Sequence, residues 1–326
     1  MPSVAPYDFD ELVEAALFLK GEPVFALADG TVRFPAGGER TVEAHAGGLL
    51  SARLDPAGGR LITGGEDGRV VAVTSDASVS ELASIGRKWV NRVAAGPSGV
   101  VGFAVGRSAF VCFADGKVKE FAQQRTVEDI AFAPKGLRLA TARYDGATLF
   151  FAGTDSAPTE LEWKGAHIGI TFSPDGRFLV TSMQENALHG WRLDDGRHMR
   201  MAGYPSKVKS WSWSAKGRWL ATAGAQVAVV WPFAGKDGPM GKPPLELGLR
   251  GGDIMVTSVA CHPTEDMAAI GYADGMILAA RFADQKEALL RRGGKGAVQT
   301  MGWDASGSRL VFGSETGEAG MVDITG

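Results

Sequence analysis

Residues 49–73 read LLSARLDPAGGRLITGGEDGRVVAV and contain three apolar runs separated by two turn signals. The first turn surrounds Pro56, and the second is the Asp67-Gly68 pair. Pro favours turns because its ring fixes φ, and Asp-Gly tolerates the positive φ values of short hairpins. The stretch therefore predicts three successive antiparallel strands joined by tight turns.

The turn around Pro56 recurs along the chain. The residue at its central place occurs eight times, at Lys20, Pro56, Pro97, Pro134, Pro174, Ala215, Pro263 and Ala305. The steps between these turn residues range from 36 to 48 residues. The longest step includes the Gly- and Pro-rich residues 234–244, which we expect to form an inserted loop. A repeat of about 41 residues is typical of repeat architectures such as propellers.

A more polar fourth strand ends most repeats, such as KVKEFAQ at 117–123, and no repeat contains a convincing helix. Four antiparallel strands per repeat predict an all-β chain that folds as a single closed β-propeller over residues 1–326. The eight repeats favour eight blades, and the weak first repeat leaves seven blades as the alternative. The last repeat stops after three strands, so we expect residues 2–9 to supply the fourth strand of the last blade.

Residues 49–73 and the stretch HIGITFSPDGRFLVTS at 167–182 resemble WD40 repeats, and the resemblance extends over essentially the whole chain. It implies a divergent, bacterial-type WD40-repeat propeller. In that family a His, a Ser or Thr, an Asp and a Trp form a hydrogen-bonded set within a blade. No repeat here holds all four, so we expect packing to hold the blades together.

The resemblance nevertheless assigns structural roles to five residues. His45, Thr63 and Asp67 match three members of the hydrogen-bonded set within one repeat. Trp191 and Trp231 occupy the place of the family's Trp at the end of the third strand. These five residues are predicted to stabilise their blades and not to contact a partner.

The composition argues against several classes of partner. Thirty-four Lys and Arg against 37 Asp and Glu give a net charge of -3, so there is no bulk positive field for nucleic acid or an anionic membrane surface. The first residues lack the basic region of a signal peptide, and no apolar run is long enough to span a membrane. The two cysteines, Cys112 and Cys261, have no spacing of a zinc site or a disulfide framework. We expect a cytoplasmic, monomeric protein.

Neither a metal nor a cofactor is predicted. The histidines fall at five different repeat positions, so no shared face is expected to gather three of them as ligands: His45, His167, His189, His198 and His262. No catalytic residue is predicted either, because the chain has no GxSxG, HExxH, Walker lysine loop or GxGxxG in its required context.

A candidate partner-binding surface centres on Trp89, the one tryptophan that the repeat places in a loop between the fourth strand and the next inner strand. Its loop precedes an inner strand, and the resemblance implies that such loops form the docking face. Cationic or polar residues predicted to share this face are Lys88, Arg92, Arg125, Lys207, Lys209 and Gln299, with Arg87 beside them. Trp and Arg are enriched among residues that dominate binding energy.

The sequence therefore predicts a non-enzymatic WD40-like scaffold that binds a protein or peptide of unknown identity on its loop-rich face. The alternative is a propeller enzyme or small-ligand binder that uses the axial channel, because a fold alone does not determine function. Small residues predominate three positions before the turn residue, and they argue against converging catalytic groups in that channel.

Overall fold

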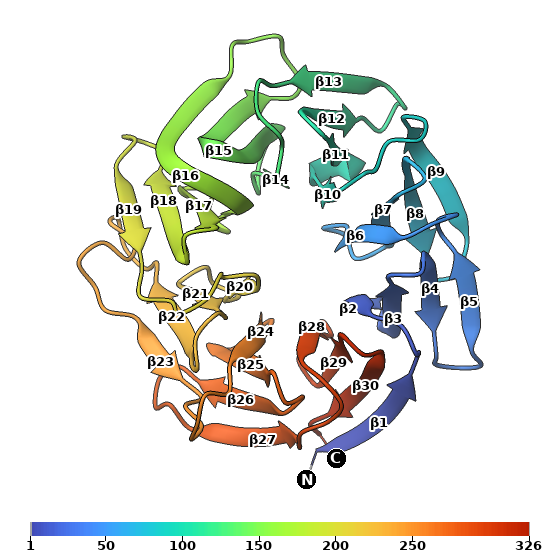
Figure 1. Ribbon diagram of the computed structural model, residues 1–326, viewed down its shortest axis with the longest axis vertical. Coiled ribbons are helices and arrows are strands. Elements are labelled where there is room, and N and C mark those ends of the chain that lie inside the picture. The colour runs from blue at the N-terminus through green and yellow to red at the C-terminus, as the bar shows by residue number, and fades with distance from the viewer. Residues whose placement is uncertain (1, 326) are drawn as a thin grey trace. The chain divides into compact units, whose positions relative to one another are not determined.

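The computed structural model describes residues 2–325, and the chain divides into two compact units. Unit 1 comprises Met1–Leu27, Phe34–Glu39 and Gly203–Gly326, and unit 2 comprises Ala28–Arg33 and Arg40–Ala202. Within residues 2–325 the regular structure consists of thirty strands and one short 3-10 helix, η1 (Pro97–Gly99) (Figure 1). None of the described residues forms a helix long and apolar enough to cross a membrane.

Unit 2 holds fifteen of these strands: β5 (Arg40–Glu43), β6 (Leu49–Leu54), β7 (Arg60–Gly65), β8 (Arg69–Thr74), β9 (Val79–Ser84), β10 (Arg92–Ala95), β11 (Val101–Val105), β12 (Ser108–Cys112), β13 (Val118–Ala122), β14 (Asp129–Phe132), β15 (Arg138–Phe151), β16 (Thr159–Phe172), β17 (Phe178–Met183), β18 (Ala187–Arg192) and β19 (His198–Met201). Strand β4 (Thr31–Phe34) has residues in both units.

Unit 1 holds the other strands: β1 (Ser3–Asp8), β2 (Val13–Leu19), β3 (Glu22–Leu27), β20 (Trp211–Trp213), β21 (Trp219–Thr222), β22 (Ala228–Pro232), β23 (Leu245–Leu247), β24 (Val256–Cys261), β25 (Met267–Tyr272), β26 (Ile277–Arg281), β27 (Glu287–Arg291), β28 (Val298–Trp303), β29 (Arg309–Ser314) and β30 (Glu318–Asp323). Residues 233–244, which include the predicted insertion, connect β22 to β23 without a strand.

The described strands form seven antiparallel sheets, six with four strands and one with six. This corrects the favoured count of eight blades in favour of the alternative of seven. The reason is that β14–β19 form one continuous sheet: β16 pairs with β15 through its first part and with β17 from His167 onward. The fourth and fifth sequence repeats therefore share a sheet, although each has its own inner strand.

All eight turn residues predicted from the repeat lie between an inner strand and the strand that follows it. The residue seven positions before each of them is buried, with at most 2% of its surface exposed: Val13, Leu49, Val90, Val127, His167, Val208, Val256 and Val298. Burial of an apolar side chain at this place stabilises its sheet by about 25 cal/mol per Å² of apolar surface. His167 fits because it makes hydrogen bonds, as described below.

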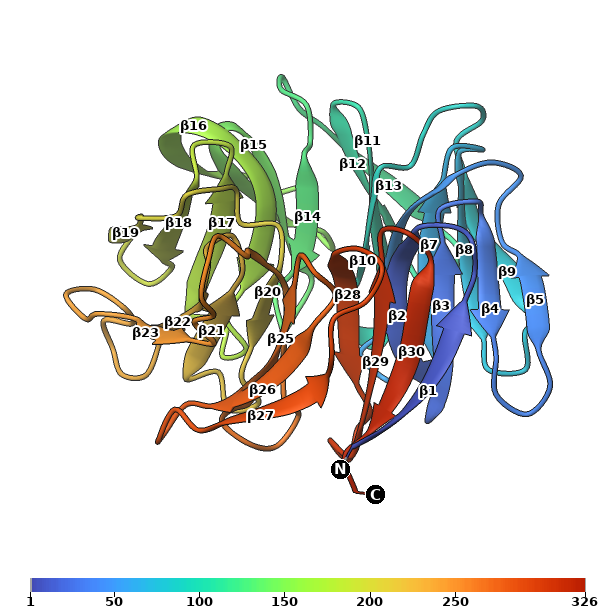
Figure 2. The ribbon, with the colours of Figure 1, turned by 60° about the horizontal axis from the view of Figure 1, so that its bottom comes forward.

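Strand β1 completes the sheet β1-β30-β29-β28 of unit 1. It pairs antiparallel with β30 from Ser3↔Asp323 to Asp8↔Glu318, and Figure 2 shows the two strands side by side. The strand nearest the N-terminus thus covers the edge of the last strand in the chain. An uncovered edge would present unpaired backbone groups to other chains.

Candidate functional site

The indole of Trp89 is 57% exposed in the loop between β9 and β10. Backbone hydrogen bonds hold this loop to the β7–β8 hairpin: Ile85 N donates to Gly68 O at 3.1 Å and Val90 N donates to Gly65 O at 3.0 Å. The neighbouring Val90 side chain is completely buried. Trp89 is therefore an exposed aromatic on a fixed backbone.

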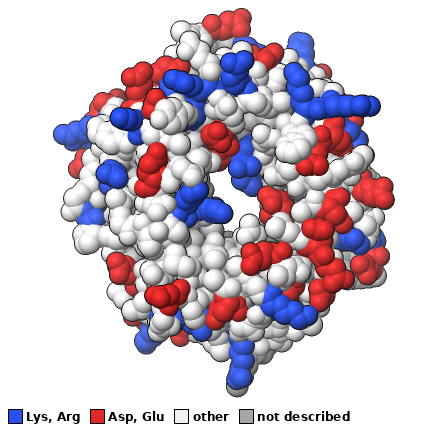
Figure 3. Space-filling view, in the orientation of Figure 1, with Lys and Arg blue, Asp and Glu red and all other residues white. Residues whose placement is uncertain are grey.

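Two further loops meet the same end of the sheet β10-β11-β12-β13. Asn91 N donates to Ala104 O at 3.1 Å, and Gln123 N donates to Arg107 O at 2.9 Å. These bonds tie the Trp89 loop and the loop after β13 to the β11–β12 hairpin. We call this region the Trp89 end; it presents Arg87, Lys88, Trp89, Arg107 and Arg125. Figure 3 shows Lys and Arg side chains mixed with Asp and Glu side chains over the upper part of the view.

The cations of the Trp89 end lack acidic partners. Within the described part of the chain, no carboxylate forms an ion pair with any of the four, and all four side chains are exposed. Arg125 instead places its guanidinium 5.9 Å from the ring centre of Tyr144, which is itself 49% exposed. Arg107 was missed in the sequence because its hairpin has no Asp-Gly signal. The Trp89 end combines uncompensated positive charge with exposed aromatic faces.

Arg92, predicted as a loop residue of this surface, begins strand β10 instead and is partly buried. Its Nε lies 3.7 Å from Oδ1 of Asp129, a buried carboxylate. Burial raises the pKa of Asp129, and the charges of Arg53 and Arg92 oppose that rise. Arg92 therefore compensates a buried charge, which corrects the expectation that it lies in a loop, and its part in docking stays a prediction.

Lys207, Lys209 and Gln299 belong to unit 1, whereas the Trp89 end belongs to unit 2. Gln299 lies in strand β28 and not in a loop, which corrects that expectation, and its side chain is exposed. Lys209 is exposed and Lys207 is partly buried, both between β19 and β20. Of the seven predicted docking residues, Lys88, Trp89 and Arg125 lie at the Trp89 end.

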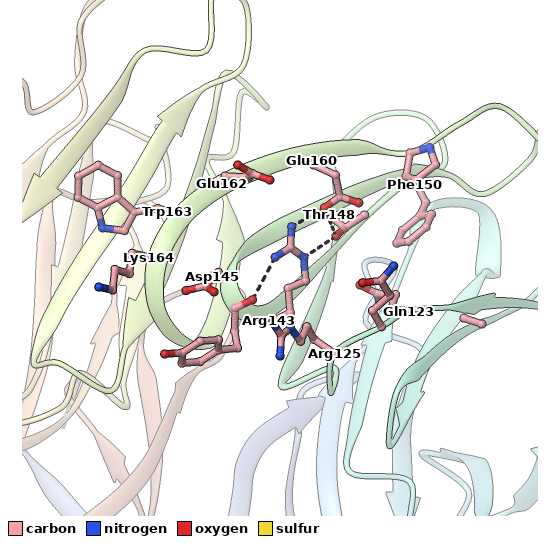
Figure 4. A pocket seen from close by; sticks show the side chains of 14 residues that line it. Gln123, Arg125, Arg143, Asp145, Thr148, Phe150, Glu160, Glu162, Trp163 and Lys164 are labelled. Atoms are coloured by element: carbon pink, nitrogen blue, oxygen red, sulfur yellow. Dashed lines mark hydrogen bonds and ion pairs between the residues drawn. The ribbon is translucent and has the colours of Figure 1, made fainter.

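A cavity of about 960 Å³ lies next to Arg125, lined by the loop after β13 and by strands β15 and β16 (Figure 4). Arg143 lies in its wall: Nε donates to Thr148 Oγ1 at 3.0 Å, Nη1 donates to Tyr144 O at 3.0 Å, and Nη2 pairs with Glu160. Thr148 Oγ1 also donates to Glu160 Oε2 at 2.8 Å. Arg143 is thus fully engaged by the protein. Its neighbours in the lining carry both signs of charge: Arg125, Asp145, Glu160, Glu162 and Lys164.

Trp163 forms one side of this cavity and stacks on His189, with ring centres 4.0 Å apart. His198 and His167 lie 5.3 and 6.3 Å from the His189 ring centre. Three histidines thus lie near one another on strands β16, β18 and β19 of one sheet. Within residues 2–325, no group of three His, Cys, Asp or Glu side chains has an arrangement that could hold a metal ion.

His189 has no hydrogen-bond partner on either ring nitrogen, and it is completely buried. Burial is the main reason that its pKa falls to about 3. His167, by contrast, is satisfied: Nδ1 lies 2.7 Å from Thr181 Oγ1, and Nε2 lies 2.8 Å from Trp163 O. The two imidazoles are neutral parts of an aromatic cluster.

The residues assigned structural roles occur in two hydrogen-bonded sets. His45 lies between Asp67 and Thr63, with Nδ1 2.9 Å from Oδ1 and Nε2 2.9 Å from Oγ1. The Asp67 carboxylate also accepts hydrogen bonds from the backbone N–H groups of Ala46 and Arg69, both at 3.1 Å. These bonds join the loop before β6 to strand β7 and to the β7–β8 turn.

The second set has a tyrosine in place of the histidine. Trp231 Nε1 donates to Tyr204 Oη at 2.7 Å, and Tyr204 Oη lies 2.7 Å from Thr222 Oγ1. Thr222 Oγ1 in turn donates to Val229 O at 2.8 Å. This set could not be predicted from the resemblance, because a tyrosine stands where the family has a histidine. Trp191, 3% exposed, packs with its ring centre 5.7 Å from that of His167.

The four-stranded antiparallel sheets define the class of the protein, a β-propeller. The crystal structure of the computationally designed Ika8 protein is similar to this chain, with a TM-score of 0.77 and 19% identity, over 97% of this chain and 98% of that one. At this identity the likeness concerns the fold alone. No curated protein matches the chain.

One family model matches the sequence itself: WD40, described as WD domain, G-beta repeat, over residues 39–71. These residues contain the set of His45, Thr63 and Asp67. With the propeller fold, this match supports a WD40-repeat propeller protein. The bacterial character of the resemblance stays a prediction.

Proposed function

We propose that this protein is a non-enzymatic scaffold that binds a protein or peptide segment at the Trp89 end. WD40 propellers generally serve as protein-interaction scaffolds, which supports the class of function. The observation that carries the site is the 57% exposed indole of Trp89 on a loop that backbone hydrogen bonds fix at both ends. Trp and Arg are enriched in binding hot spots, and here an exposed Trp lies in the same loop as exposed cations.

The fixed loop and its cations also explain how binding at the Trp89 end would be favoured. A fixed loop meets its partner without first being ordered, so less conformational entropy opposes binding. Trp89 supplies apolar area, and the surrounding cations supply orientation and a faster encounter. The proposal includes a cytoplasmic location and the absence of catalysis.

The test compares two substitutions that each remove an exposed apolar side chain. Trp89→Ala changes the proposed site, whereas Leu249→Ala removes a 73% exposed leucine in unit 1. Proteins captured from the native cell by wild type are identified by mass spectrometry, purified, and titrated against all three forms. We expect Trp89→Ala to weaken binding at least about tenfold and Leu249→Ala to leave it unchanged. Equal affinities for wild type and Trp89→Ala would reject the site.

The cavity around Arg143 favours a second candidate, a small-ligand binder that uses this cavity in place of an axial channel. Its volume of about 960 Å³ lies within the range of ligand sites. A thermal-shift screen of metabolites on wild type and on Ala122→Trp, a change of an exposed residue in the cavity wall, tests it. A compound that stabilises wild type but not Ala122→Trp would support this candidate, and a screen without such a compound would count against it.

A further inference from the structure

We infer that the segment bound at the Trp89 end is an acidic peptide: a short stretch with several Asp or Glu residues beside one aromatic or aliphatic side chain. This inference rests on the proposed function and names the chemistry of its partner. It follows from three features of the described residues, which are the local charge, the lack of compensation and the arrangement of the aromatics.

The segment that carries most of the Trp89 end has a charge opposite to that of the whole chain. Residues 87–125 contain seven Lys or Arg against two acidic residues, in a protein whose net charge is -3. Both acids are already engaged: Asp115 pairs with Lys117 at 3.2 Å, and Glu120 accepts a hydrogen bond from Ser108 at 2.6 Å. The positive field of Arg87, Lys88, Arg107 and Arg125 is therefore directed at solvent, where it attracts negative groups.

The loops that carry these cations are also joined by backbone hydrogen bonds. The backbone bonds from Asn91 to Ala104 and from Gln123 to Arg107 fix the loops of Lys88 and Arg125 on either side of the Arg107 hairpin. Like charges at one end of one sheet repel each other, and a bound carboxylate would relieve that repulsion. Guanidinium groups also bind carboxylates with two parallel hydrogen bonds, which gives direction as well as attraction.

The aromatics and the nearby carboxylates determine which anion fits. Trp89 offers one exposed indole, and Tyr144 is already covered in part by the Arg125 guanidinium. Proteins that bind single-stranded nucleic acid stack successive bases on several aromatics along a basic groove. Here the cavity beyond Arg125 is lined by both signs of charge, with Glu160 paired to Arg143 and with Asp145 and Glu162 also in the wall, so no continuous basic groove receives a phosphate chain. A peptide can carry its charges where the cations are and end before these carboxylates, so the surface favours an acidic peptide over nucleic acid.

The first experiment selects, from random peptides, those that bind the Trp89 end. Random peptides of about 12 residues displayed on phage are selected on the full-length protein, with Trp89→Ala protein used to remove peptides that bind elsewhere. We expect the Trp89-dependent peptides to be enriched in Asp and Glu around an aromatic or aliphatic residue. Trp89-dependent peptides that are neutral or basic would overturn the acidic inference but support the proposed function. A selection with no Trp89-dependent peptides would count against both.

The second experiment measures the charge dependence directly. A fluorescent copy of the most enriched acidic peptide, or (if none is enriched) a peptide of Glu residues around one Trp, is titrated by fluorescence anisotropy against wild type and variants. Arg87→Glu with Arg107→Glu should weaken binding about tenfold or more at low salt, because repulsion replaces attraction. The matched control is Lys135→Glu with Lys216→Glu, two exposed lysines in turns that follow inner strands.

The outcomes separate the two claims. Binding that weakens with added salt and with the first pair of substitutions, but not with the control pair, supports the acidic peptide. Equal effects of the two pairs would overturn it, because net charge alone would then explain the attraction. Tighter binding of a single-stranded oligothymidylate than of the peptide at the same salt would also overturn it, in favour of nucleic acid. A thermal melt of each variant confirms that the protein is folded.

Discussion

The carboxylate of Asp129 accepts a hydrogen bond from the backbone N–H of Ile170, with 2.9 Å between Oδ2 and N. Asp129 lies five residues before its turn residue, and Ile170 lies four residues before the next one. The same relation joins consecutive inner strands elsewhere: Ser51 to Val93 at 3.1 Å, Ser210 to Val259 at 3.0 Å and Thr300 to Ala16 at 3.3 Å. One repeat position therefore supplies a side-chain oxygen that links neighbouring repeats.

Replacing Asp129 with Ala should destabilise the protein more than replacing Ser51 with Ala. The first change leaves the Ile170 N–H and the partly buried Arg92 without their acceptor, at a cost of about 2–4 kcal/mol. The second change removes one neutral hydrogen bond, worth about 1 kcal/mol. Urea unfolding of both variants at neutral pH measures the difference. If Asp129→Ala cost no more than Ser51→Ala, the charge of this residue would have no structural role.

Asp67→Ala should cost more than Asp29→Ala, although both residues begin an Asp-Gly hairpin. Asp67 binds His45 and two backbone N–H groups, and its pKa is lowered by these hydrogen bonds against the effect of burial. Asp29 is partly exposed and binds mainly Thr31. We expect a loss of about 2–3 kcal/mol for Asp67→Ala and about 0.5 kcal/mol for Asp29→Ala in urea unfolding. Similar losses would show that the His45 set adds nothing beyond a turn.

Tyr204→Phe should destabilise the propeller by about 1–3 kcal/mol, because it leaves Trp231 Nε1 without its acceptor in a buried place. The ring of Tyr204 is retained, so packing changes little. Urea unfolding followed by tryptophan fluorescence measures the stability. Tyr204→His tests whether an imidazole can take the same place, as His45 does in its own set. A stability of Tyr204→Phe equal to wild type would contradict the role given to this hydroxyl.

The features that depend on a repeated local pattern could be predicted from the sequence. The turn residues and the buried residue seven positions before each of them could be located because every repeat solves the same packing problem with the same spacing. His167 could be placed in that column even though its type differs. The hydrogen bonds of His45 could likewise be inferred, because all its partners lie within one repeat.

The features that could not be predicted from the sequence depend on contacts between repeats. Arg92 is partly buried because Asp129, a residue of the next inner strand, needs a positive charge nearby. The continuous sheet β14–β19 arises because β16 extends from one repeat into the next without a break. No residue type in this stretch indicates such an extension. The role of Tyr204 could not be predicted, because a phenol replaces an imidazole only where its hydroxyl lies within hydrogen-bond distance of Thr222 and Trp231. Such substitutions become visible only when the partners are placed in space.

Removing residues 2–8 should make the protein less stable and prone to association. Strand β1 covers the edge of β30, and Tyr7 packs against Phe25 with ring centres 5.5 Å apart. The deletion would expose both the backbone of β30 and this aromatic surface, which can pair with another chain. Size-exclusion chromatography and thermal melts measure the effect, and Tyr7→Ala serves as the variant that removes the aromatic contact but keeps the strand. A deletion protein that stays monomeric and as stable as wild type would contradict the role of β1.

His189→Leu should make the protein less sensitive to acid. The folded-state pKa of His189, about 3, lies below its ordinary value of 6.5, because burial disfavours the charged imidazole. Below pH 6.5 the unfolded chain therefore binds a proton that the folded protein does not, and stability falls as the pH drops from 6.5 towards 3. At pH 5 this one residue should cost about 2 kcal/mol relative to pH 7.5.

Leucine has no proton to gain and no ring nitrogens to leave unpaired. At pH 7.5 we expect His189→Leu to lie within about 1 kcal/mol of wild type, since the loss of stacking on Trp163 offsets the removal of two unsatisfied polar atoms. Urea unfolding at pH 7.5 and pH 5.0 gives the two differences that matter. A loss between these pH values as large in His189→Leu as in wild type would show that His189 does not control the acid sensitivity, and the lowered pKa would then have no consequence for folding.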